Sequence, residues 1–180
     1  PLRVRCVALI RHRNGVALVS SEILVIGLSH HTAPVEIREK LSVATEAMTS
    51  RVAALLRMLP IDEAMLLSTC NRVELWSAAD DIESASRALR AYLAEHAAPD
   101  QLDNFLYEKA GRDAVSHAFR MTSSLDSMVV GEPQILGQVK GAFGISEGAH
   151  ATGPLLSSCF QRAFSVAKRV RRETGIAAGR

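Results

Sequence analysis

Four segments of the chain have the hydrophobic patterns of β-strands. Residues 23–28 and 64–67 are continuous apolar runs, which are typical of buried strands. Residues 73–77 alternate between apolar and polar side chains, and this alternation predicts a strand with one face in water. We assign residues 104–108, which carry three apolar side chains, as a fourth strand. The chain is therefore expected to form a small sheet.

Apolar side chains recur at helical spacing between these strands. The two stripes predict one helix over residues 45–59 and another over residues 82–96, with a shorter helix opened by Pro34. The resulting order is β-α-β-β-α-β. This order indicates a ferredoxin-like split βαβ unit, which is an antiparallel sheet with two helices on one face.

The pattern divides the chain into three parts. Residues 1–21 are an N-terminal extension, in which two apolar segments flank Asn14-Gly15 and form either a hairpin or a loose arm. Residues 22–110 form the ferredoxin-like unit. Residues 111–180 have helical periodicity and are expected to pack against the sheet. The predicted fold class is thus α+β, a ferredoxin-like sheet unit followed by a helical subdomain.

Composition limits the class of protein. The 180 residues are 48% hydrophobic and carry a net charge of +2, which is typical of a chain that buries a core. No apolar segment approaches the ~20 residues that span a bilayer, so we expect a cytoplasmic protein with no membrane partner. The cysteines are Cys6, Cys70 and Cys159, and their wide spacing argues against a disulfide framework and against a metal site.

Cys70 is the first candidate for chemistry. It follows the apolar run at residues 64–67 and lies two residues before Arg72. The end of a strand holds a side chain on a rigid base, and a neighbouring guanidinium favours thiolate over thiol. The alternative is that Cys70 is a small buried hydrophobe, as most free cysteines are. Cys159 lies on an apolar helical stripe and is expected to be a core residue.

Four segments resemble glutamyl-tRNA reductase, in the order that this family has them. They are GLSHHTAPVE at 27–36, STCNRVE at 68–74, SMVVGEPQILGQVK at 127–140 and AKRVRRET at 167–174. The resemblance covers about residue 22 to the C-terminus and corresponds to the family's N-terminal catalytic domain. It implies that a cysteine thiolate attacks the ester of glutamyl-tRNA. NADPH then reduces the thioester to glutamate-1-semialdehyde, an oxidoreductase step of tetrapyrrole (porphyrin) biosynthesis.

The resemblance also assigns residues of the site. Cys70 matches the nucleophile, and His117 matches a histidine near the thiol that positions the substrate or acts as acid or base. On the helical pattern alone, a histidine in this place is more often a packing residue than a catalyst. Arg72 suits the substrate's side-chain carboxylate, unless it merely pairs with Glu74 on the surface. The positions that match substrate-contacting residues are Thr69, Asn71, Arg72, Ser127, Glu132, Pro133, Gln134 and Gln138.

The sequence differs from the family in that it has no recognisable motif for binding the nicotinamide cofactor. No Gly-x-Gly-x-x-Gly follows a predicted strand, and the sequence stops where the family's NADPH domain begins. We therefore expect NADPH to be bound by a domain absent from this chain, and the isolated chain to act as an esterase at most. The full-length family is expected to form a homodimer and to have a partner enzyme that accepts the semialdehyde.

Two other functions stay open from the sequence. One is a cysteine hydrolase unrelated to tRNA, which would use Cys70 with His117 on thioesters. The other is a tRNA- or protein-binding module without turnover, because several cations on one helix can follow phosphates. Its support is the basic cluster Arg162, Lys168, Arg169, Arg171 and Arg172.

Overall fold

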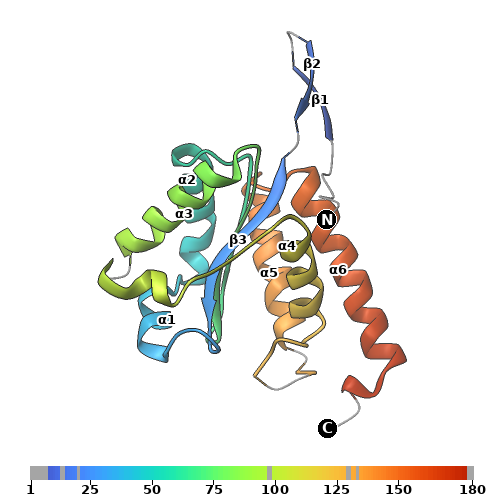
Figure 1. Ribbon diagram of the computed structural model, residues 1–180. Coiled ribbons are helices and arrows are strands. Elements are labelled where there is room, and N and C mark those ends of the chain that lie inside the picture. Colours follow the sequence, from blue (N-terminus) through green and yellow to red (C-terminus); the bar gives the residue numbers. More distant parts are fainter. Residues whose placement is uncertain are drawn as a thin grey trace.

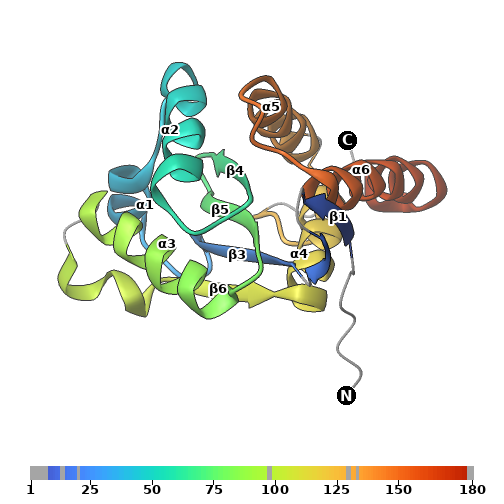
Figure 2. The same ribbon diagram turned by 90° about the horizontal axis from the view of Figure 1, so that it is seen from above.

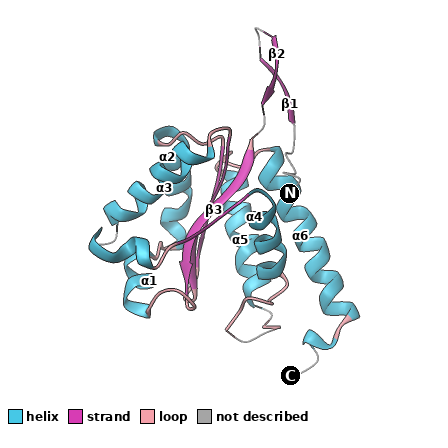
Figure 3. Ribbon diagram, viewed as in Figure 1, coloured by secondary structure: helices cyan, strands magenta, loops and turns pink. Residues whose placement is uncertain are grey.

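The computed structural model describes residues 8–12, 15–19, 21–96, 99–128, 131–132 and 134–177. Its centre is a four-stranded antiparallel sheet (Figures 1 and 3), and the strand order is β4-β5-β3-β6 (Figure 2). The strands are β3 (Glu22–Ser29), β4 (Glu63–Ser68), β5 (Arg72–Ala79) and β6 (Tyr107–Ala110). The first and third strands of the unit are central, as in a ferredoxin-like fold. The predicted fold class is confirmed.

Helices cover both faces of the sheet (Figure 2). One layer contains α1 (Val35–Leu41), α2 (Thr45–Met58) and α3 (Ile82–His96). The other contains α4 (Gly111–Thr122), α5 (Gln134–Gly148) and α6 (Pro154–Glu173), which a 3-10 turn, η2 (Gly175–Ala177), follows. None of the described helices combines the length and the apolar character needed to cross a membrane.

The two helical layers explain the apolar runs. Along β3, Leu24 and Ile26 pack into the core formed with α2 and α3, whereas Ile23 and Val25 pack against α4, α5 and α6. Side chains of a strand alternate between the two faces, so a strand covered on both sides is apolar throughout. The continuous run at residues 23–28 is the consequence.

The same covering contradicts the wet face predicted for the strand at residues 73–77. Every residue of β5 is buried, including the polar side chains of Arg72, Glu74 and Ser77. Alternation predicts exposure because polar side chains usually face water. Arg72 and Glu74 face the α4–α6 layer, where protein groups rather than solvent satisfy them. Ser77 alternates to the other face, and its hydroxyl donates to the Leu24 carbonyl (3.5 Å).

The fourth strand lies later than predicted. A 3-10 helix, η1 (Pro99–Asn104), covers the start of the segment at residues 104–108, and β6 begins at Tyr107. Leu102 of η1 is buried in the core, and its carbonyl accepts the N–H groups of Phe105 (2.9 Å) and Leu106 (3.2 Å). These apolar side chains therefore belong to a turn that packs on the core, and only the residues after them pair with β3.

Two strands in the N-terminal extension pair antiparallel. They are β1 (Ala8–His12) and β2 (Gly15–Val19), and Figure 1 shows them beyond the end of β3. Of the two alternatives for this extension, the pairing is that of a hairpin. Cys6 and Asn14 lie outside the described residues. The division of the chain into parts at residues 21 and 110 stays a prediction.

A carboxylate from the sheet caps the start of α6. Glu63 of β4 is buried, and its two oxygens accept the N–H groups of Leu155 (2.9 Å) and Leu156 (2.8 Å). Pro154 at the first position has no N–H to satisfy. The first turn of a helix has unpaired N–H groups and partial positive charge, so a carboxylate is well suited to this place. Glu63 thereby ties β4 to α6.

Replacing Glu63 with alanine is expected to lower the free energy of unfolding by about 1–3 kcal/mol, because two N–H groups lose their acceptor and one of them is buried. Urea denaturation measures the change. Glu63→Gln keeps one acceptor oxygen without the charge, and its loss is expected to be intermediate. A Glu63→Ala protein as stable as the parent would contradict the capping role.

Candidate active site

Cys70 lies at the tip of the turn that joins β4 to β5, and it is exposed. Thr69 organises this turn. Its Oγ1 accepts the N–H groups of Asn71 (3.2 Å) and Arg72 (3.0 Å), and its own N–H donates to the Arg72 carbonyl (2.9 Å). A threonine hydroxyl here acts as the backbone acceptor of a turn. The exposed position excludes the alternative that Cys70 is a buried hydrophobe.

The loop after β3 supports the turn from the side. Arg38 of α1 donates from Nε to the Cys70 carbonyl (3.1 Å) and from Nη1 to the Ala33 carbonyl (2.7 Å). The N–H of His30 donates to the Asn71 carbonyl (2.8 Å). Both carbonyls at the tip are therefore held, and the thiol projects from a fixed backbone. The sequence analysis missed Arg38, since one arginine on a short helix has no distinguishing pattern.

A small pocket opens beside Cys70 and joins two distant segments. The turn provides Thr69, Cys70, Asn71 and Arg72, and the segment that leads into α5 provides Ser127, Glu132, Gln134, Ile135 and Gln138. The structure thus brings together the residues predicted for substrate binding. Two predicted residues are not in this lining: Pro133 lies outside the described residues, and His117 lies elsewhere.

Behind the turn, Glu74 is fully buried and accepts hydrogen bonds from several side chains. Its Oε1 accepts Arg72 Nη1 (2.8 Å), the Tyr107 hydroxyl (2.5 Å) and His117 Nε2 (2.9 Å). Its Oε2 accepts the indole N–H of Trp76 (2.7 Å). We assign His117 Nε2 as a donor because an ionised carboxylate only accepts. These residues form the Glu74 network.

Gly27 makes room for the Glu74 network. It lies on β3 between Glu74 of β5 and Tyr107 of β6 in the strand pairing. A Cβ at this position would lie 2.8 Å from Glu74 Cα and would also meet the Val73 carbonyl. Only glycine allows the central strands to approach this closely at the network.

The Glu74 network keeps its carboxylate ionised. Burial by itself raises the pKa of Glu74, but the hydrogen bond and charge of His117, the charge of Arg72 and the hydrogen bond from Tyr107 outweigh it and lower the pKa to about 2. Burial and the neighbouring carboxylate raise the pKa of Tyr107, so its hydroxyl stays protonated and donates. Arg72 and Glu74 are therefore a buried ion pair at neutral pH.

This ion pair predicts a loss of stability in acid. The pKa of Glu74 falls from its ordinary 4.5 in the unfolded chain to about 2 in the folded one, so the stabilisation is full above pH 4.5 and is lost as the pH falls toward 2. Its size is on the order of 3 kcal/mol. Urea denaturation at a series of pH values measures it. Glu74→Gln is the control and is expected to have a flatter profile over this range; equal profiles would contradict the prediction.

The contacts of Arg72 and His117 place them in the wall behind the pocket. Arg72 is 2% exposed, and its Nη2 donates to the Asp126 carbonyl (2.7 Å) while Nη1 bonds Glu74. The ring of His117 stacks on Trp76 with centroids 5.7 Å apart, and its Nδ1 lies 3.7 Å from Asp126 Oδ2. The pair of Arg72 and Glu74 therefore exists, but it is buried rather than on the surface. No hydrogen bond joins His117 to Cys70 among the described residues.

Comparison with known proteins decides the family. Residues 26–174 match the family model described as Glutamyl-tRNAGlu reductase, N-terminal domain. The chain belongs to this family. The resemblance stated from the sequence is confirmed, and the Cys70 turn, the pocket and the Glu74 network all lie within the matched residues.

Individual relatives agree with this assignment. The glutamyl-tRNA reductase of Syntrophotalea carbinolica is 49% identical over 156 residues, which cover 86% of this chain and 35% of the relative. The glutamyl-tRNA reductase of Geobacter metallireducens is 48% identical over 157 residues, which cover 86% of this chain and 36% of the relative. The solved structure of glutamyl-tRNA reductase from Methanopyrus kandleri has a TM-score of 0.69 and 32% identity, and covers 84% of this chain and 35% of that one. The chain spans about a third of the length of these reductases.

The sequence analysis of this reductase domain missed most of the Glu74 network. Glu74 was considered only as a surface partner of Arg72, and Tyr107, Trp76 and Asp126 were not considered for the site. One signal was present: Arg72, Glu74 and Trp76 alternate along one strand and so share a face. A tryptophan on the same face as two charged residues favours a covered face, in which the charges pair.

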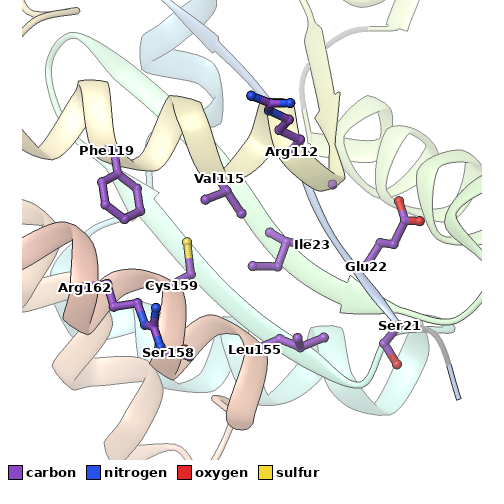
Figure 4. A pocket seen from close by; sticks show the side chains of 11 residues that line it. Ser21, Glu22, Ile23, Arg112, Val115, Phe119, Leu155, Ser158, Cys159 and Arg162 are labelled. Atoms are coloured by element: carbon purple, nitrogen blue, oxygen red, sulfur yellow. The ribbon is translucent and has the colours of Figure 1, made fainter. Parts of the chain in front are cut away.

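A larger cavity in the domain lies away from this chemistry. It has a volume of about 490 Å3 and lies between α4 and α6, at the start of β3 (Figure 4). Its lining includes the apolar side chains of Ile23, Val115, Leu155 and Cys159, and none of the residues predicted for the reductase site. Burial raises the pKa of Cys159 to about 11, so its thiol stays protonated. Cys159 is a core residue, as predicted.

Proposed function

We propose that the chain performs the acyl-transfer half of a glutamyl-tRNA reductase. The thiolate of Cys70 attacks the ester carbonyl of glutamyl-tRNA, the C–O bond to the terminal ribose breaks, and glutamate is left as a thioester on Sγ while the tRNA hydroxyl takes up a proton. The observation that supports this most strongly is the exposed thiol on a rigid turn, beside a pocket built from both predicted substrate segments.

The pocket has groups that suit both charges of a glutamyl group. Arg72 has five N–H donors, of which two are used on Glu74 and on the Asp126 carbonyl, so others are left for the side-chain carboxylate of the substrate. Glu132 in the lining suits the α-ammonium group. The side-chain amides of Asn71 and Gln138 can donate hydrogen bonds to the carboxylate or accept them from the ammonium group. We infer selectivity for a short dicarboxylic amino acid.

His117 acts in this proposal as a positioning residue. Its ring holds Glu74, and Glu74 in turn holds Arg72 at the wall of the pocket. An arginine fixed in this way has its N–H groups directed before the substrate arrives, so less entropy is lost on binding. A role of His117 as acid or base toward Cys70 stays a prediction.

The described residues do not fit NADPH, and we derive no step through it. The neighbouring strands of the four-stranded sheet are antiparallel, and no glycine-rich turn joins a described strand to a helix. In our proposal the reduction to glutamate-1-semialdehyde, a step of tetrapyrrole biosynthesis, needs parts of the longer relatives. Water or another thiol would discharge the thioester of this chain. A homodimer and an acceptor enzyme stay predictions from the resemblance, and a cytoplasmic location stays a prediction from the apolar pattern of the sequence.

The proposal predicts a covalent glutamyl adduct. Mixing the chain with glutamate-labelled glutamyl-tRNA is expected to yield labelled protein that survives acid and is released by hydroxylamine, as a thioester is. Peptide mass spectrometry should place the label on Cys70. Prior alkylation with iodoacetamide is expected to prevent labelling, and aspartyl-tRNA tests the selectivity. Absence of both an adduct and accelerated deacylation would refute the proposal.

A further inference from the structure

The proposed function does not account for the charges at the end of α6. This end lies beside the segment that lines the Cys70 pocket. Gly131 has a φ of +86° and approaches η2 so closely that a Cβ would collide with the Ile176 carbonyl. Gly131 directly precedes Glu132, which lines the pocket with Ser127. The part of a bound substrate that extends out of the pocket on this side therefore lies next to the end of α6.

The exposed face of this end is cationic. It carries the α6 cation cluster, which consists of Lys168, Arg169, Arg171 and Arg172. Glu173 is the one acidic residue of this last turn, so four cations against one carboxylate leave three positive charges. Ala163 and Ala167 face the core; Lys168, Arg169 and Arg172 are exposed on the side away from it, and Arg171, one turn after Ala167, is half-buried at the edge of that side.

The ion pairs within this cluster are open to exchange. Arg169 and Arg172 each donate to Glu173 at 2.8 Å, with side chains that are 72% and 75% exposed. Exposed pairs of this kind contribute little to stability. Lys168 and Arg171 have no carboxylate partner within the described part of the chain. The cluster can thus pair with an outside anion at little loss.

We propose that the α6 cation cluster binds backbone phosphates of the tRNA whose 3′ end enters the Cys70 pocket. This inference rests on the proposed function. An ester held in the pocket remains attached to a polyanion, which must leave over a neighbouring surface, and counterion release favours a cationic one. The favourable helix dipole accounts for one or two cations in a last turn, but not for four. The contact is to phosphates and so is independent of base sequence.

A matched pair of variants tests the location. Lys168→Ser with Arg171→Ser removes two charges from the cluster, whereas Arg57→Ser with Arg87→Ser removes two exposed charges from α2 and α3, across the sheet (Figure 2). Fluorescence anisotropy with tRNA, between about 50 and 200 mM salt, measures binding. The α6 variant is expected to bind at least about fivefold more weakly, and its slope of log affinity against log salt should be shallower by about 1.5. The α2/α3 variant should match the parent.

A small substrate separates this inference from the proposed function. The glutamyl ester of adenosine has the reacting bond and no phosphate, so both variants should form the Cys70 adduct from it at the parental rate. Unchanged tRNA binding in the α6 variant, or an equal loss in the α2/α3 variant, would overturn the inference. If the parent forms no adduct from either ester, the proposed function fails, and the anisotropy comparison still decides whether the cluster binds tRNA.

Discussion

Replacing Cys70 with serine is expected to slow formation of the glutamyl adduct by at least about a thousandfold. A serine hydroxyl is a much weaker nucleophile near neutral pH, and the structure places no base in hydrogen-bond contact with position 70 among the described residues. Quenched time courses with labelled glutamyl-tRNA measure the rate. The exchange of sulfur for oxygen at an exposed tip leaves the packing unchanged.

Two controls make this result specific. Cys159→Ala removes the other described thiol, which is buried, and its adduct rate is expected to equal that of the parent. Urea denaturation should show the same free energy of unfolding for Cys70→Ser and the parent, so that lost labelling reports chemistry alone. Labelling of the serine protein at the parental rate would show that another group accepts the glutamyl moiety.

Replacing Glu74 with alanine is expected to lower the free energy of unfolding by about 3–5 kcal/mol, because it leaves the buried guanidinium of Arg72 without its counter-charge. The donors of Tyr107, Trp76 and His117 lose their acceptor at the same time. Domains of this size have a total stability of about 5–15 kcal/mol, so much of it would be lost. Thermal and urea denaturation measure the change.

A second variant shows whether charge is the cause. Arg72→Met combined with Glu74→Leu removes both members of the ion pair and fills the space with apolar groups. Replacing a whole buried pair in this way is often nearly neutral, so the double variant should recover the part of the stability that the unpaired guanidinium costs, while the donors of Tyr107, Trp76 and His117 still lack their acceptor. It should still fail to select glutamate, since Arg72 is gone. A Glu74→Ala protein with parental stability would contradict the structural role of the network.

The two experiments separate reactivity from architecture. The thiol of Cys70 stands on an exposed turn and contributes little to folding, whereas Glu74 is fully buried, is not itself part of the pocket lining and contacts that lining through Arg72. Loss of the first should remove the chemistry from a stable protein. Loss of the second should weaken the fold that holds Arg72 at the pocket.

The sequence by itself determined the elements, their order and the family. Periodicity predicted the helices at residues 45–59 and 82–96 and the strands on either side of Cys70. Burial of one helical face, or of a whole strand, determines the local spacing of apolar residues, so it can be recognised in the sequence. The family resemblance rested on four short segments. Two of them, around Cys70 and from Ser127 to Gln138, supplied nearly all of the pocket lining.

Only the tertiary structure decided how polar residues are used. A polar side chain in a strand has the same local pattern whether it meets water or a buried partner, so the burial of Arg72 and Glu74 depends on the α4–α6 layer that covers them. The same holds for His117, whose partner lies 43 positions away along the chain. Contacts between distant segments have no local pattern, and for this reason the Glu74 network and the position of the α6 cation cluster beside the pocket emerged from the fold alone.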